Sequence, residues 1–179
     1  MYNRIELFLS EFNMIYKLQY GFRKRHSTEH ALLSILEEIR RNLNNGEFSC
    51  GAFIDLEKAF DTVNHTILLS KLEHYGIRDS SLTWIASYLS NRKQSVKLNV
   101  VNCKHERLSF GVPKGSILGP LLFIIYVNDM HSAVKSSIMH HFADDTNLLV
   151  SSKNPNKIAK LLNRPKTPFW MDVRQSPLA

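Results

Sequence analysis

The clearest indication of the fold of this chain is the stretch Ile138-Met139-His140-His141-Phe142-Ala143-Asp144-Asp145-Thr146-Asn147-Leu148-Leu149-Val150. Two strand-like runs, 138–143 and 146–150, flank adjacent acids, so the stretch predicts a β-hairpin with Asp144 and Asp145 at its turn. Two neighbouring carboxylates repel each other, and this repulsion is costly in apolar surroundings unless a cation lies between them. Asp is also common in turns because its side chain bonds nearby backbone, and for this pair alone the turn is the stronger explanation.

A third acid, Asp55, ends another apolar run far away in the sequence. Residues 48–56 are short and apolar, which predicts a buried strand that delivers Asp55 at its C-terminal end. An unpaired carboxylate in that position is destabilising unless it serves a metal or a basic partner. Because Mg²⁺ prefers oxygen ligands, the sequence predicts that Asp55, Asp144 and Asp145 converge as a ligand set for two-metal phosphoryl transfer.

The rest of the chain divides into helices and strands by the period of its apolar residues. Helices are predicted over 5–15, from Ser27 or Thr28 to Leu43, over 65–75 with Gly76 as the cap, over 80–89, from the loop 111–116 to about Met130, and from Pro155. The alternating run 94–100 and a second strand before Gly111 predict a hairpin. The pattern is α+β, without an internal repeat or an interdomain linker.

Composition restricts the domain count and the class of partner. With 179 residues, of which 44% are hydrophobic, the chain can bury one core, so we expect one domain or the larger part of one. Lys and Arg exceed Asp and Glu by 23 to 16, and the net charge of +7 favours a polyanionic partner such as nucleic acid or an acidic membrane surface. Two widely spaced cysteines suit neither a disulfide framework nor a zinc site.

Nothing in the sequence predicts secretion or a membrane span. The N-terminal stretch carries Arg4, Glu6 and Glu11, which a signal peptide does not tolerate. The longest apolar run, 117–127, is shorter than the roughly 18 to 20 residues that a bilayer span needs. We therefore expect a cytoplasmic or nuclear protein without a membrane partner, and the sequence leaves the choice between those two compartments open.

Three stretches resemble, in order and spacing, the catalytic blocks of reverse transcriptases from non-LTR retrotransposons of the jockey-like or LINE type. The sequence Phe-Ile-Asp-Leu-Glu-Lys-Ala-Phe-Asp at 53–61 is similar to the first block, 111–123 to the second, and Phe-Ala-Asp-Asp at 142–145 to the third. Two further segments, 19–28 and 92–96, are similar to parts of the family that lie before and between these blocks.

This resemblance covers about residues 1–163 and implies a fold and an activity. The expected fold is a polymerase palm-like antiparallel sheet packed against helices, with partial fingers and no thumb. The expected activity is RNA-directed DNA synthesis on an RNA template and a DNA primer, with deoxynucleoside triphosphates as substrates. Two Mg²⁺ ions are the implied cofactors, with Mn²⁺ as the alternative ion. The oligomeric state is left open.

The resemblance also implies roles for single residues near the carboxylates. Asp55 and Asp144 would bind both metal ions, Asp145 would support the primer end, and the carbonyl of Leu56 could add a backbone ligand. Phe60 matches the bulky residue that crowds the sugar 2′ position and selects deoxyribonucleotides. An ordinary core aromatic is the alternative explanation for Phe60.

Other implied contacts involve the nucleotide and the nucleic-acid strands. Lys114 and Gly115 lie in the loop that would approach the incoming nucleotide, although the family usually has glutamine at the position of Lys114. A lysine loses the amide acceptor and adds a compact charge, so nucleotide alignment or fidelity could be altered. Arg23, Arg92 and Lys93 are expected to contact phosphates, and a solvated surface charge is the alternative for each of them.

The ends of the sequence depart from the family. The upstream fingers block is absent, and residues 164–179 match nothing expected after the palm, so we expect a domain over 1–163, truncated at both ends, with a disordered tail. A catalytically inactive, nucleic-acid-binding remnant of a retroelement is therefore the alternative function. An unrelated metal-dependent nuclease is a weaker third, which the loop 111–115 disfavours.

Overall fold

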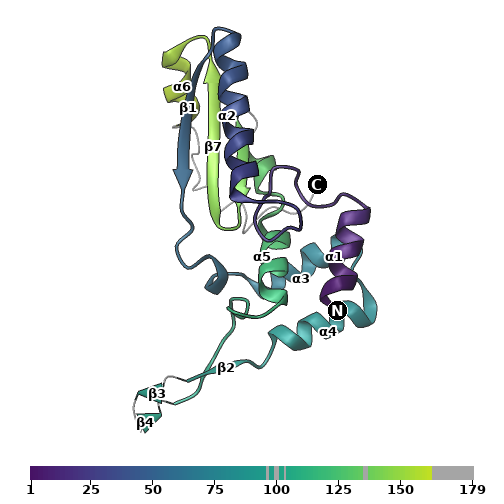
Figure 1. Ribbon diagram of the computed structural model, residues 1–179. Helices are drawn as coiled ribbons and strands as arrows, with labels where there is room; N and C mark the ends of the chain where they lie inside the picture. Colours follow the sequence, from purple (N-terminus) through teal and green to yellow (C-terminus); the bar gives the residue numbers. More distant parts are fainter. Residues whose placement is uncertain (96, 99–100, 103, 135–136, 163–179) are drawn as a thin grey trace. The chain divides into compact units, whose positions relative to one another are not determined.

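The computed structural model describes residues 1–95, 97–98, 101–102, 104–134 and 137–162, which combine helices with antiparallel sheets (Figure 1). These residues form two compact units, a first unit of residues 1–57 and 127–162 and a second unit of residues 58–126. The tail that the sequence analysis expects to be disordered, 164–179, lies outside the described residues.

The first unit is built on a three-stranded antiparallel sheet in the order β1-β7-β6. Its strands are β1 Phe48–Ile54, β6 Ile138–Phe142 and β7 Asp145–Ser152. The predicted hairpin forms, but its turn lies one residue earlier than expected: Phe142 pairs with Asp145, so Ala143 and Asp144 make the two-residue turn and Asp145 is the first residue of β7. Ala143 has φ 60°, the left-handed conformation that short hairpin turns require.

Strand β1 differs from its prediction as a buried strand. It lies at the edge of the sheet, and its side chains Phe48 and Phe53 are 56% and 81% exposed. The physical reason is that an edge strand has a neighbour on one side only, and an apolar run in the sequence does not reveal which strand will be at the edge.

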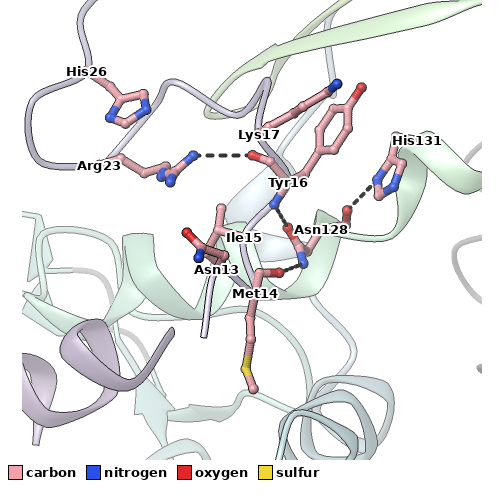
Figure 2. A pocket seen from close by; sticks show the side chains of 9 residues that line it. All are labelled: Asn13, Met14, Ile15, Tyr16, Lys17, Arg23, His26, Asn128 and His131. Atoms are coloured by element: carbon pink, nitrogen blue, oxygen red, sulfur yellow. Dashed lines mark hydrogen bonds between the residues drawn. The ribbon is translucent and has the colours of Figure 1, made fainter. Parts of the chain in front are cut away.

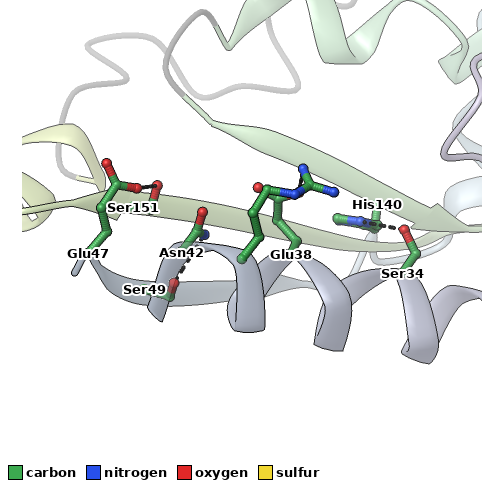
Figure 3. Close-up of polar contacts among 8 residues, drawn as sticks. Ser34, Glu38, Asn42, Glu47, Ser49, His140 and Ser151 are labelled. Carbon is green, nitrogen blue, oxygen red and sulfur yellow. Dashed lines mark hydrogen bonds and ion pairs between the residues drawn. The ribbon is translucent and has the colours of Figure 1, made fainter. Parts of the chain in front are cut away.

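Helix α2, Thr28–Asn44, packs on β1 and β6 (Figure 1). It begins as predicted at Ser27, whose hydroxyl accepts a hydrogen bond from the backbone N–H of His30. Polar contacts join this helix to the sheet (Figure 3): Ser34 Oγ and His140 Nε2 are 3.2 Å apart, and Asn42 Nδ2 donates to Ser49 Oγ at 3.1 Å. The apolar residues Leu32, Leu36 and Leu43, which keep the helical period, are exposed in this unit.

Two more helices belong to the first unit, α1 Tyr2–Glu11 and α6 Pro155–Leu162. Helix α6 starts where the sequence predicts and packs on β7 and β1. Helix α1 buries Ile5 and Leu9 as expected, but it ends at Glu11 and does not continue to residue 15. Asn13, with φ 50°, takes a left-handed conformation that a helix cannot continue through. A 3-10 helix, Met130–Ala133, precedes β6.

The second unit contains a short 3-10 helix, Ala59–Asp61, and the helices α3 His65–His74, α4 Asp79–Leu89 and α5 Leu118–Val127. The predicted hairpin forms, but the run expected as one strand over 94–100 is divided. Strand β2 Lys93–Gln94 pairs with β5 Glu106–Arg107, and β3 Lys97–Leu98 pairs with β4 Val101–Asn102. Gly76, with φ 90°, follows α3 as predicted.

Helix α5 is apolar on all sides, and every residue from Leu118 to Val127 except Pro120 is buried. Lys71 of α3 is also buried, and its ammonium group donates to the carbonyl of Tyr126 at 2.6 Å. That carbonyl lies in the last turn of α5, where the helix dipole favours a cation. Helix α5 has only ten residues, and within the described ranges we find no helix with the length and hydropathy needed to cross a bilayer.

Candidate metal and nucleotide site

Asp55 and Asp145 come together at one end of the β1–β7 pair. Ile54 is opposite Thr146, so one further antiparallel step places Asp55 opposite Asp145. Both residues line one hollow of about 450 Å³, which also contains residues from the first turns of α2. Asp55 and Asp145 are exposed, so an ion from the solvent can reach their carboxylates. The register of the sheet therefore unites two acids that lie far apart in the sequence.

The surroundings of these two acids are mostly apolar and contain no cation. Their other neighbours in the hollow are Thr28, Ala31, Leu32, Ile35, Phe53, Ile54, Phe142 and Asn147. None of these described lining residues is Lys, Arg or His, so no side chain of the lining neutralises the two carboxylates. Carboxylate pairs in such surroundings attract a divalent cation.

Asp144 is the second residue of the hairpin turn and is half-buried. It adjoins Asp145 in sequence but does not line the hollow that Asp55 and Asp145 share. Within the part of the chain that the structure describes, no three His, Cys, Asp or Glu side chains are grouped as ligands for one metal ion. The structure thus brings two of the three predicted carboxylates to one hollow and leaves the third beside it in the turn.

These donors fit Mg²⁺, which is commonly held by one or two carboxylates together with water and substrate phosphates. Asp55 and Asp145 supply charged oxygen atoms without a competing nitrogen or sulfur donor among the residues that line their hollow. Leu56, which directly follows Asp55, is half-buried and lies just beyond the end of β1. A complete coordination shell would therefore need ligands from the substrate or the solvent.

The turn that carries Asp144 is held by a segment that the sequence analysis gives no positioning role. The buried side chain of Gln19 accepts hydrogen bonds from the backbone N–H groups of Gly21, at 2.9 Å, and Ala143, at 3.2 Å. Main-chain bonds reinforce this contact, because His141 N donates to Leu18 O and Tyr20 N donates to His141 O. The segment 18–21 therefore lies beside β6 and is hydrogen-bonded to that edge of the sheet.

Gly21 lies too close to the turn for any side chain. A Cβ atom at this position would overlap the backbone nitrogen of Ala143. Glycine is therefore required by a close approach of two backbones, which is one of the uses of this residue type. The Gln-Tyr-Gly run at 19–21 is the only part of this contact that the sequence pattern indicates. Its partner, Ala143, lies 124 residues from Gln19, and the sequence does not show that the two meet.

The two histidines of β6 are buried neutral groups. His141 has its Nδ1 atom 3.0 Å from Thr146 Oγ1, and its Nε2 atom has no hydrogen-bond partner among the described residues. Burial, with smaller contributions from the neighbouring His131 and His140, lowers the pKa of His141 from 6.5 to about 4. Burial also lowers the pKa of His140. Both imidazoles are therefore uncharged near neutral pH.

In the second unit, the residues around Phe60 are bonded to the loop that begins at Gly111. Val112 N donates to Phe60 O at 2.8 Å, and Gly111 N donates to Val63 O at 2.8 Å. His65 Nε2 lies 2.8 Å from the Gly111 carbonyl, to which it can only donate. Gly111 has φ 86°, and a Cβ there would meet backbone atoms of residue 61 at 3.0 Å. Hydrogen bonds therefore join two of the sequence blocks in one cluster.

Phe60 is half-buried, and its ring stacks on the ring of Phe123 with 4.6 Å between centroids. The ammonium group of Lys114 forms an ion pair with Asp61, with 2.6 Å between Nζ and Oδ2. Both side chains of this pair are exposed, and Gly115 beside them is exposed as well. The residue that departs from the resembled family thus has an acidic partner, which the sequence analysis did not identify.

The three predicted phosphate contacts differ in their surroundings. Arg23, in the first unit, is half-buried, and its Nη1 atom donates to the carbonyls of Tyr16 at 3.2 Å and Gln19 at 3.0 Å. Burial lowers the pKa of this guanidinium. In the second unit, Arg92 is half-buried and Lys93 is exposed on β2. Arg23 therefore also stabilises its own loop, whereas Lys93 is a surface charge.

Comparison with known proteins identifies relatives over most of the chain. Residues 1–166 match the family described as reverse transcriptase (RNA-dependent DNA polymerase). The chain is 30% identical over 171 residues to a probable RNA-directed DNA polymerase from transposon BS of Drosophila melanogaster, covering 88% of this chain and 18% of that protein. It is 33% identical over 145 residues to the RNA-directed DNA polymerase from mobile element jockey of the same species, covering 77% and 16%.

The chain therefore spans less than a fifth of the length of these two relatives. Among solved structures, it is similar to a chain of a partial Cas6-RT-Cas1–Cas2 complex, with 26% sequence identity and a TM-score of 0.39. That similarity covers 75% of this chain and 22% of the other.

Proposed function

This chain belongs to the reverse transcriptase (RNA-dependent DNA polymerase) family, and we propose that its first unit carries the nucleotidyl-transfer centre of an RNA-directed DNA polymerase. The single observation that supports this most directly is the meeting of Asp55 and Asp145 at one hollow. The proposed substrates are an RNA template, a DNA primer and deoxynucleoside triphosphates. The β1-β7-β6 sheet with α2 is the proposed polymerase palm, and partial fingers accompany it.

The proposed cofactor is a pair of Mg²⁺ ions, and Mn²⁺ has similar ligand preferences. Asp55, Asp144 and Asp145 are the proposed carboxylate ligands, and the carbonyl of Leu56 adds a neutral oxygen. When bound, the ions supply charge neutralisation on the triphosphate and a lower pKa for the primer 3′-hydroxyl. The residues Gln19 and Gly21 hold the turn that carries Asp144, so they act as positioning residues.

The nucleotide contacts are proposed for the second unit. Phe60, supported by Phe123, excludes the ribose 2′-hydroxyl by its bulk. Lys114 and Gly115 are proposed to face the incoming nucleotide, and the ion pair with Asp61 fixes the lysine charge in the loop. Arg23 of the first unit, and Arg92 and Lys93 of the second, are proposed to bind phosphates of the template and primer.

Primer extension on an RNA template with Mg²⁺ tests the proposal. The Asp145→Asn and Asp55→Asn variants keep the shape of each side chain and remove its charge. We expect each to reduce extension by at least ~100-fold, because even partners of a metal ligand contribute about 10- to 100-fold. Glu37→Gln, which removes an exposed charge on α2 outside the hollow, is the matched control and should extend normally.

The alternative function is a non-catalytic, nucleic-acid-binding remnant of a retroelement. The net charge of +7 favours a nucleic-acid partner whether or not the chain is catalytic. If the wild-type chain binds the primer and template tightly but shows no extension with Mg²⁺ or Mn²⁺, the remnant is supported and the polymerase proposal fails.

A further inference from the structure

A second hollow of the first unit, of about 430 Å³, is lined by basic and aromatic side chains (Figure 2). The basic residues are Lys17, Arg23, His26 and His131. No carboxylate is among its lining residues within the described part of the chain. The charged residues of this hollow are basic, whereas those of the hollow that contains Asp55 and Asp145 are acidic.

Arg23 contributes a half-buried positive charge to this hollow. Its Nη1 atom is bonded to two carbonyls, and burial lowers its pKa. No acidic side chain pairs with Arg23 or with Lys17 among the described residues. A half-buried cation without a counter-charge is destabilising, and a bound anion would relieve that cost.

The walls of the hollow are held in place by a hydrogen-bond network (Figure 2). Asn128 accepts from the backbone N–H of Tyr16 at 2.7 Å and donates to the carbonyl of Met14 at 2.8 Å. His131 Nδ1 lies 2.9 Å from the carbonyl of Asn128. The rings of Tyr16 and His131 stack with 3.9 Å between centroids and 4° between planes. The hollow therefore does not need to be assembled by its ligand.

We propose that this hollow binds a backbone phosphate of a single-stranded nucleic acid, with Lys17 and Arg23 as the charged contacts. The stacked Tyr16 and His131 rings border the same space and would receive an adjacent base. Cations interleaved with aromatic rings are the surface that single strands use, because the charges follow the backbone and the rings stack with any base. The net charge of +7 favours the same partner. A free nucleotide carries the same phosphate chemistry, so the test must separate these two sources.

The Arg23 contact rests on the phosphate contact proposed above, but fluorescence anisotropy with a short labelled single strand, without divalent metal, tests this site separately from nucleotidyl transfer. Lys17→Gln is expected to weaken binding by roughly five- to tenfold at low salt. It should also reduce the steepness of log K against log salt concentration by about 0.7, the value for one phosphate contact on a single strand. Lys153→Gln, an exposed lysine of the same unit outside the hollow, is the matched control.

Arg23 needs a second variant, because its bonds to Tyr16 and Gln19 also stabilise the loop. Arg23→Lys keeps the charge, so it should retain most of the binding that Arg23→Gln loses, with both variants checked for folding by circular dichroism. Equal affinity and equal salt dependence for Lys17→Gln and Lys153→Gln would overturn the proposal. A competition experiment separates a strand from a free nucleotide. If a low concentration of deoxynucleoside monophosphate displaces the labelled strand from wild type but not from Lys17→Gln, the ligand is a free nucleotide, and the proposal of a single strand is overturned.

Discussion

The side-chain oxygen of Gln19 accepts a hydrogen bond from the backbone N–H of Ala143, 3.2 Å away, in the turn that carries Asp144. The same oxygen accepts from Gly21, so one buried amide ties the loop 18–21 to the hairpin. The position of the turn therefore depends on residues that lie near the start of the chain and are not among those that line the shared hollow. Substitutions in this loop should disturb the site without altering any proposed metal ligand.

Gly21→Ala should destabilise the first unit and reduce activity. The added methyl group would overlap the Ala143 backbone, so the loop or the turn must move. We expect a loss of about 1 to 3 kcal/mol in the free energy of unfolding, the range for overpacking, measured by urea denaturation. Gly51→Ala is the control, because a methyl group there meets nothing closer than 3.6 Å. Equal stability of the two variants would contradict the tight contact.

The stability of the first unit should decrease as the pH falls from about 6.5 to about 4. The buried imidazole of His141 has its pKa lowered to about 4, whereas in the unfolded chain it titrates near 6.5. Between these values the unfolded chain binds the proton and the folded chain does not, so acid favours unfolding. Below about 4 both states are protonated, and the dependence ends.

This pH effect amounts to roughly 3 kcal/mol for the difference between the two pKa values. Denaturation at a series of pH values measures it, and His141→Leu should flatten the curve between pH 4 and 6.5. His140 has a lowered pKa for the same reason and will leave part of the slope. His74→Leu, at an exposed position, should leave the curve unchanged. An unchanged curve for His141→Leu would show that this imidazole is not the source.

Phe60→Val should admit ribonucleotides. The smaller side chain removes bulk from the position proposed to exclude the 2′-hydroxyl, while Phe123 remains below it. We expect discrimination between deoxynucleotides and ribonucleotides, measured as the ratio of kcat/KM values, to fall by about 10- to 100-fold. Phe110→Val makes the same change at an exposed position of the second unit. If the Phe60→Val variant still discriminates between deoxynucleotides and ribonucleotides, Phe60 is only a core residue.

Lys114→Gln should change nucleotide selection with little change in stability. The ion pair with Asp61 is exposed, so its loss should alter the free energy of unfolding by no more than about 0.5 kcal/mol. Glutamine regains an amide acceptor as well as a donor, so we expect fewer misincorporated nucleotides in primer extension. Lys104→Gln, another exposed lysine of the second unit, is the control. Identical error rates for both variants would remove Lys114 from the nucleotide site.

Local sequence patterns predicted most of the secondary structure. The cap at Ser27, the stop at Gly76 and the hairpin around Asp144 depend on contacts within a few residues, and such contacts can be read from the chain. The order and spacing of the motifs also identified the family. The predicted end of α1 was wrong, because the apolar pattern of residues 5–15 does not reveal the left-handed conformation of Asn13.

Which distant residues meet depends on the tertiary fold. An apolar run shows that a strand will form, but it names neither its partner nor its register, and a shift by one residue would turn every side chain to the other face. The pairing of Ile54 with Thr146 places Asp55 beside Asp145, and long-range contacts likewise produce the Gln19–Ala143 bond and the Lys114–Asp61 ion pair. Local patterns predicted the helices and hairpins, apart from some of their ends, and the order of the motifs predicted the family. The juxtaposition of distant side chains belongs to the fold, because it depends on packing between segments that carry no mark of one another.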